Sequence, residues 1–103
     1  MKITSLQQLK DWNANPTKEA PYVMEWFYDW FFEELIVPGK TEEAIEARDV
    51  CIEFTMICEK MTKEDATMRV DGNLGYYNGY GAVRWGANFK KIFPHISHPI
   101  LGI

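Results

Sequence analysis

The sequence predicts a mainly α-helical single domain over residues 1–103, a small bundle of about four to five helices. Three observations indicate this fold class. Apolar residues recur at helical spacing between residues 41 and 60. Residues 21–36 form a second, more continuously apolar stretch. Because 47% of the 103 residues are apolar, the chain can fill one core without disulfides or metals.

A short first helix is predicted after Thr4 or Ser5, because either hydroxyl can accept a hydrogen bond from the first helical turn. The residues expected on its apolar side are Leu6, Leu9 and Trp12. Residues 13–17 carry Pro16 among small polar residues, which predicts a turn that ends this helix.

The second helix is predicted over residues 21–36, with Pro21 at the first helical position. Three of its four acidic residues, Glu25, Asp29 and Glu33, recur at every fourth position, and the fourth is Glu34; almost every other position is apolar. A helix that is apolar nearly all round is usually buried at the centre of a protein. The same acids argue against a transmembrane helix, since each would cost a few kcal/mol (about 2–4) within a bilayer.

The third helix is predicted over residues 41–60, with Thr41 as its N-cap and acids in its first turn. One apolar stripe follows 3.6-residue spacing and consists of Ala47, Val50, Cys51, Phe54, Ile57, Cys58 and Met61. The opposite side carries a narrow acidic ridge formed by Glu42, Glu46, Asp49 and Glu53.

A capping-box pattern at residues 62–65 predicts a further short helix that ends near Val70. The dipeptides Asp71-Gly72 and Asn78-Gly79 favour turns, so a Gly/Tyr-rich loop or a short β-hairpin is expected near residues 67–80.

Two continuations remain open. One is a β-meander with strands at 67–70, 73–77 and 80–85; the other is a loop followed by a helix over 81–93, which the apolar spacing favours. Residues 94–103 contain two prolines and are expected to form an extended C-terminal tail.

Charge is distributed unevenly along the chain. The net charge is −4, yet residues 19–59 hold 11 acids against Lys40 and Arg48, whereas residues 72–103 hold three bases and no acid. The excess of acids over residues 19–59 produces a negative electrostatic field. This field would repel nucleic acid phosphates, which argues against direct nucleic-acid binding. It would attract a protein with a basic surface and select among partners.

These features predict a protein-binding regulator or inhibitor that presents a negatively charged helical surface to a basic partner. The expected partner-binding residues are Glu25, Asp29, Glu33, Glu42, Glu46, Asp49, Glu53, Tyr76, Tyr77 and Tyr80. The tyrosines are included because Tyr in Gly-rich loops supplies rigid contacts at low entropic cost. Two alternatives are that the acids form only a solvated strip, or that they pair internally with Arg84, Lys90 and Lys91.

In composition alone, the chain resembles phage anti-defence inhibitors and toxin-immunity proteins, some of which imitate the charge of nucleic acid. That resemblance implies a viral or phage regulator. Another hypothesis, a structural subunit, arises from the apolar tail residues Ile96, Ile100, Leu101 and Ile103, which could join two copies of the chain.

A further hypothesis, placed ahead of the structural subunit, is a small metal-dependent hydrolase that uses Glu42, Glu43, Glu46 and Asp49, with Glu25 and Asp29 as additional candidates. The spacing of Glu42, Glu43 and Glu46 resembles the EExxE motif of all-helical nucleoside-triphosphate pyrophosphatases, which hold magnesium through carboxylates. The ExxD that this family carries on a following helix is missing, so a metal-dependent hydrolase is kept only as an alternative. The sequence assigns no catalytic residue, no metal ligand and no cofactor.

The remaining reactive residues favour structural roles. Cys51 and Cys58 stand two helical turns apart, about 10 Å along a helix axis, which is beyond disulfide reach. His95 and His98 have only two cysteines as further soft ligands, far upstream in the sequence. The N-terminus has no apolar signal region, so a cytoplasmic location is expected.

Overall fold

The computed structural model describes residues 3–21, 23–80 and 88–96, and it is mainly helical as the sequence predicts. Its labelled elements are α1 (Leu6–Ala14), α2 (Met24–Trp30), η1 (Phe31–Ile36), α3 (Thr41–Glu59) and α4 (Lys63–Tyr80). Residues 88–92 are also helical.

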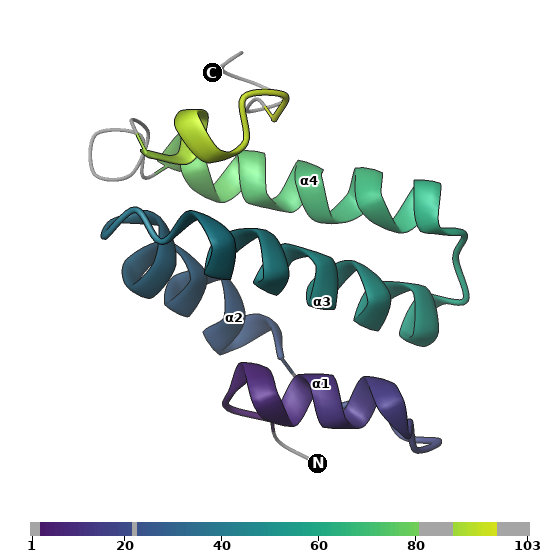
Figure 1. The fold of residues 1–103 in the computed structure, drawn as a ribbon. Coiled ribbons are helices and arrows are strands. Elements are labelled where there is room, and N and C mark those ends of the chain that lie inside the picture. Colours follow the sequence, from purple (N-terminus) through teal and green to yellow (C-terminus); the bar gives the residue numbers. More distant parts are fainter. Residues whose placement is uncertain (1–2, 22, 81–87, 97–103) are drawn as a thin grey trace.

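Helix α3 lies between α1 and α4 (Figure 1). Helices α3 and α4 run side by side in opposite directions, and η1 also packs against α3. The short helix at 88–92 lies over the C-terminal half of α4. Helix α3 thus packs against α1, η1 and α4 and occupies the centre of the bundle.

Helix α1 forms as predicted, with Ser5 as its N-cap. The Ser5 hydroxyl accepts a hydrogen bond from the Gln8 amide at 3.2 Å. Leu9 and Trp12 are buried, and the Trp12 ring meets the Phe54 ring edge-on at a centroid distance of 5.3 Å. This contact fixes α1 against α3.

The second helix begins at Met24 and not at Pro21, and its second half is a π-helix. The wider turn is visible in the hydrogen bond from the Val37 amide to the Phe32 carbonyl, five residues back, at 2.9 Å. Central burial is confirmed, since Phe27, Phe31, Phe32 and Ile36 are at most 1% exposed. Gly39, with φ of 75°, ends the connection to α3 in a conformation that favours glycine.

Helix α3 matches the predicted range closely. Thr41 is its first helical residue and not its cap, since the N-cap is Lys40. The predicted stripe is confirmed: Ala47, Val50, Cys51 and Phe54 are buried, while Ile57, Cys58 and Met61 are partly buried against the core. Lys60, in the left-handed conformation with φ of 52°, ends the helix.

Helix α4 corrects the prediction for residues 67–80, which form neither a loop nor a β-hairpin. The capping box holds, since Thr62 Oγ1 accepts from the Asp65 amide at 3.2 Å, but the helix continues past Val70 through Asp71 and Gly72 to Tyr80. The buried row that keeps it helical consists of Ala66, Val70 and Leu74, each at most 1% exposed. Its three glycines cost about 0.5–1 kcal/mol each relative to alanine, and packing of this row offsets that loss.

The C-terminal segment returns to the core. Phe89 and Phe93 are buried, and their rings meet those of Phe32 and Phe31 at 5.4 and 6.2 Å. The helix at 88–92 agrees with the predicted stop near Pro94, and Ile96 is buried at 5% exposure after a turn. The start predicted at 81–87 and the tail at 97–103 lie outside the described residues.

Candidate acidic interface

Four carboxylates form an exposed row along α3, which we call the α3 acidic ridge: Glu42, Glu46, Asp49 and Glu53. On a helix, residues three and four apart lie on one side, so these acids follow each other at a rise of about 4.5–6 Å. The opposite side of α3 is buried, and there Cys51 hydrogen bonds with Tyr28 of α2. The ridge therefore points away from α2.

The chain's own bases compensate the ridge only in part. Lys10 of α1 approaches Glu46 at 3.3 Å, with both side chains about half exposed. Arg48 approaches Asp49 at 3.7 Å. An exposed pair such as Lys10–Glu46 is worth about 0–1 kcal/mol. No described residue forms an ion pair with Glu42 or Glu53.

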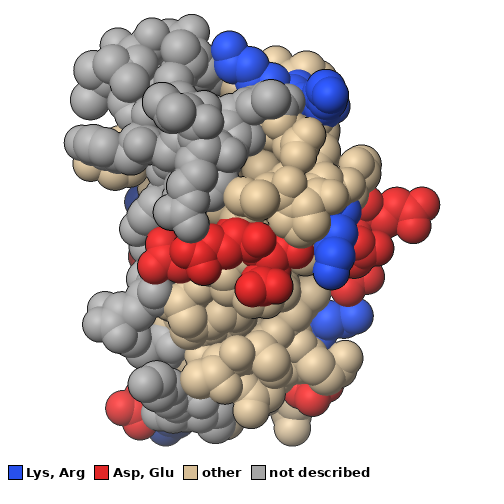
Figure 2. Space-filling model, turned by 90° about the vertical axis from the view of Figure 1, so that its left-hand side faces the viewer, with Lys and Arg blue, Asp and Glu red and all other residues tan. Residues whose placement is uncertain are grey.

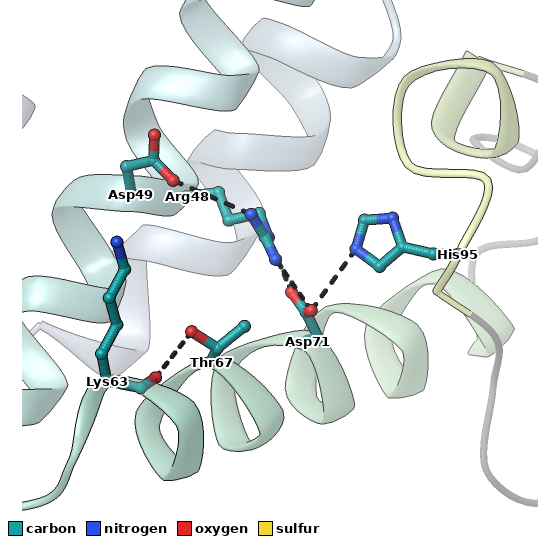
Figure 3. Close-up of polar contacts among 6 residues, drawn as sticks. All are labelled: Arg48, Asp49, Lys63, Thr67, Asp71 and His95. Atoms are coloured by element: carbon teal, nitrogen blue, oxygen red, sulfur yellow. Dashed lines mark hydrogen bonds and ion pairs between the residues drawn. The ribbon is translucent and has the colours of Figure 1, made fainter.

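A groove of about 320 Å³ runs beside the ridge. Its acidic wall is formed by Asp49 and Glu53, and its apolar part by Ile52 and Met56. Lys63, the first residue of α4, also lines it. Figure 3 shows the Lys63 side chain rising toward α3 near Asp49, although these two residues form no ion pair. The groove thus places carboxylates next to apolar side chains.

Figure 2 shows a band of acidic side chains across the end of the molecule at which η1 passes into α3. The exposed acids that η1 and the first turn of α3 contribute are Glu33 and Glu34, and Glu42 and Glu43. The prediction did not assign Glu34 or Glu43 to the site. The sequence does carry a sign of their position: one Glu-Glu dipeptide lies on each side of Pro38-Gly39. The tight connection at Pro38-Gly39 brings the two dipeptides to the same end of the fold.

The acids of the second helix do not form one continuous ridge with those of α3. Asp29 is exposed on α2, whereas the α3 acidic ridge lies on the side of α3 that faces away from α2. Glu33 lies in η1, where the wider turn changes the predicted four-residue spacing. The side chain of Glu25 lies outside the described residues.

The predicted internal pairing with C-terminal bases has no support among the described residues. Lys90 and Lys91 are exposed on the helix at 88–92, and no ion pair with a described acid involves them. A separate group of basic side chains lies at the top of Figure 2, away from the acidic band. Arg84 lies outside the described residues.

A partly buried charge network joins α3, α4 and the C-terminal segment (Figure 3). Arg48 Nε and Nη2 donate to the two carboxylate oxygens of Asp71 at 2.7 and 2.8 Å, and the two side chains are 16% and 17% exposed. His95 Nε2 lies 3.4 Å from Asp71 Oδ2. The Arg48 guanidinium also lies 5.7 Å from the centre of the Phe93 ring. The hydrogen bond to Asp71 raises the pKa of Arg48, although burial opposes the change.

This network ties α3 to α4 and to the C-terminal segment, with Arg48 and Asp71 largely shielded from solvent and His95 exposed at 57%. The sequence did not reveal it, because Arg48 and Asp71 are 23 residues apart and Asp71 was expected in a turn. His95 is exposed and approaches the Asp71 carboxylate, and His98 lies outside the described residues.

The tyrosines expected in a loop stand on a helix. Tyr76 is 40% exposed on α4 and makes a contact with the rest of the chain. Tyr77 and Tyr80 belong to α4, but their side chains lie outside the described residues. Met68, at 68% exposure, is the more exposed apolar side chain on this helix, and the sequence did not single it out.

The hydrolase hypothesis required acids that converge from two helices. Glu42, Glu43, Glu46 and Asp49 all stand on α3 and point outward. Among residues 3–21, 23–80 and 88–96, no group of three or more His, Cys, Asp or Glu side chains is arranged to hold a metal ion. Cys51 and Cys58 are free thiols.

No protein family model, curated protein or solved structure matches this chain. Of the helices that the structure describes, none is long and apolar enough to cross a membrane.

Proposed function

We propose that this chain is a cytoplasmic protein-binding regulator or inhibitor whose α3 acidic ridge docks on a basic surface of another protein. The observation that carries the proposal is the exposed row of four carboxylates beside a groove with an apolar part. The free thiols are consistent with a reducing compartment.

The ridge opposes folding, which supports a role in binding. Its successive acids are like charges three or four residues apart, each pair costing about 0.2–0.5 kcal/mol. Only Glu46 and Asp49 have a basic neighbour within 4 Å among the described residues. A surface helix with a purely structural role is stabilised when acidic and basic side chains alternate along its exposed side. The α3 acidic ridge consists of acidic side chains alone and therefore produces a negative electrostatic potential.

The groove suits lysine or arginine side chains of a partner. These side chains combine an aliphatic stem with a cationic head. The stem would lie on Ile52 and Met56, and the head would reach Asp49 or Glu53. The acidic band at the η1–α3 end extends the same field and would steer the partner during encounter.

The test is capture of partners from cell extract with a neutralised ridge, E42Q/E46Q/D49N/E53Q. The matched control removes four exposed acids elsewhere, Glu19, Glu59, Glu64 and Asp65. We expect the partner to be lost from the ridge variant and retained by the control, and to be released from the unchanged protein by high salt. Equal capture by both variants would reject the ridge as the interface.

A nucleic-acid mimic is a narrower form of the same proposal. It requires the partner's basic surface to be one that normally holds phosphates. Duplex DNA or heparin should then compete with the chain for the captured partner. A partner that both the chain and the polyanion bind at the same time would exclude mimicry while leaving the acidic interface intact.

A further inference from the structure

A second hollow lies on the other side of α3. It has a volume of about 330 Å³, is open to solvent on one side, and is lined by Ala20, Pro21 and Val23 together with residues of α2, α3 and α4. Val23 and Phe54 supply much of its apolar wall, and Cys51 and Cys58 line it from α3. Because Cys51 is on the side opposite the α3 acidic ridge, this cavity is separate from the proposed interface.

Some polar atoms of the wall bond to one another. Asn73 Nδ2 donates to the Tyr28 hydroxyl at 3.1 Å, and Tyr28 is only 2% exposed. Thr55 donates to the Cys51 carbonyl at 2.8 Å. Burial raises the pKa of the Cys51 thiol to about 12, so this group is neutral at physiological pH. Water in a cavity needs two to four polar partners, and this wall offers few.

The charged lining residues pair with each other. Arg69 of α4 approaches Glu59 of α3 at 3.7 Å, and both side chains are about half exposed. A ligand carrying its own charge would lose its hydration in the cavity without gaining an unpaired opposite charge. The wall therefore discriminates against ions and favours a neutral molecule.

We infer that this cavity binds a small, uncharged, largely apolar molecule. A dry cavity of about 150 Å³ holds benzene, so this larger space accommodates a molecule of roughly nine to twelve non-hydrogen atoms. Such a molecule would displace poorly bonded water and cover the apolar wall. It would also contact Ala20, Pro21 and Val23 together with α3 and α4, so its binding would stabilise the folded chain.

Indole is a suitable probe, with indole-3-acetate and tryptamine as charged molecules that share its ring. The readout is alkylation of Cys51 by iodoacetamide, followed by mass spectrometry. Cys51 is 5% exposed, so it reacts when the cavity opens. At an indole concentration ten times its dissociation constant, alkylation should be about tenfold slower. Binding of indole to the closed form lowers the fraction of molecules in which the cavity is open by that factor. The charged analogues should have little effect at the same concentration.

Two variants show whether the cavity is responsible. Cys58→Phe fills the space from α3, and Ala20→Leu narrows it from the exposed segment, so the test survives if one of them fails to fold. Both should abolish protection by indole, whereas Met68→Phe on the exposed side of α4 should retain it. Protection that persists in the filled variants would overturn the inference. So would the absence of saturable protection in the unchanged protein up to the solubility limit of indole.

Discussion

The contact between Arg48 and Asp71 should be the most sensitive polar contact in the fold. We consider Asp71→Asn, which keeps the size of the side chain but removes its charge and one of two acceptors. In the unchanged protein both oxygens accept from the guanidinium, at 2.7 and 2.8 Å. After the substitution, a guanidinium that is only 16% exposed faces an amide.

The expected loss follows from these distances and exposures. Breaking a fully buried pair by removing one partner costs about 3–5 kcal/mol, and a charge-assisted hydrogen bond is worth about 1.5–3 kcal/mol. Since the two side chains are 16% and 17% exposed, water recovers part of this loss. We therefore expect a decrease of about 2–3 kcal/mol in the free energy of unfolding, or a fall in Tm of about 10–20 °C.

The assay is urea unfolding at pH 7, followed by helical circular dichroism, with Glu59→Gln as the matched control. Glu59 also joins α3 to α4, because its carboxylate lies 3.7 Å from the Arg69 guanidinium. The side chains of Glu59 and Arg69 are, however, about half exposed. This control should lose less than about 1 kcal/mol. The double variant Arg48→Met/Asp71→Asn should be destabilised by less than the sum of its single variants. Equal losses for Asp71→Asn and Glu59→Gln would refute this account of the network.

Three further predictions concern helix α4, helix α1 and the buried thiol. Gly72→Ala should raise the free energy of unfolding by about 0.5–1 kcal/mol, because Gly72 lies within α4 and an added Cβ meets no atom within 4 Å; a loss in thermal unfolding would instead support the turn that the sequence predicted. Ser5→Ala should cost about 1 kcal/mol through loss of the cap to Gln8, and an unchanged Tm would contradict that role. The Cys51 thiol, with its pKa raised to about 12, stays protonated when folded while the unfolded thiol ionises near its usual value of 9.0, so stability falls as pH rises. The difference in unfolding free energy between the unchanged protein and Cys51→Ala, measured in reducing buffer, should therefore fall by about 1 kcal/mol from pH 9 to pH 10, and a constant difference would show that the thiol is not shielded.

Helix α3 could be predicted from the sequence because one long stripe of apolar residues decides both its boundaries and its orientation. The same periodicity places Glu42, Glu46, Asp49 and Glu53 on the outward side, where the structure has them. A pattern that spans five turns averages over local exceptions, so small errors at the N-cap did not affect the face that is exposed.

Helix α4 could not be predicted in the same way. Local turn signals at Asp71-Gly72 and Asn78-Gly79 outweighed the shorter row of Ala66, Val70 and Leu74 in the sequence. In the fold, burial of that row against neighbouring helices determines the outcome. The π-helical turn of η1 and the pairing of Arg48 with Asp71 also depend on the tertiary arrangement, which no local pattern records.

The groove beside the ridge illustrates the same limit for the site. The spacing of Asp49 and Glu53 predicts that both are exposed on one side of the helix. No pattern in the sequence indicates that their neighbours Ile52 and Met56 belong to a binding surface. Lys63 enters the groove from α4, and its position depends on how the two helices pack. Hydrophobic periodicity predicts which side of a helix is exposed. The shape of the groove beside α3 can be predicted only when the packing of α3 against α4 is known.

The most direct test of the acidic interface is a comparison of folding and binding in E42Q/E46Q/D49N/E53Q. Relief of like-charge repulsion roughly balances the lost pairs, so unfolding free energy should remain within about 1 kcal/mol of the unchanged protein. Affinity for the captured partner should nevertheless fall at least about tenfold, equivalent to about 1.4 kcal/mol. Full affinity in the folded variant would show that the partner binds to another surface of the molecule.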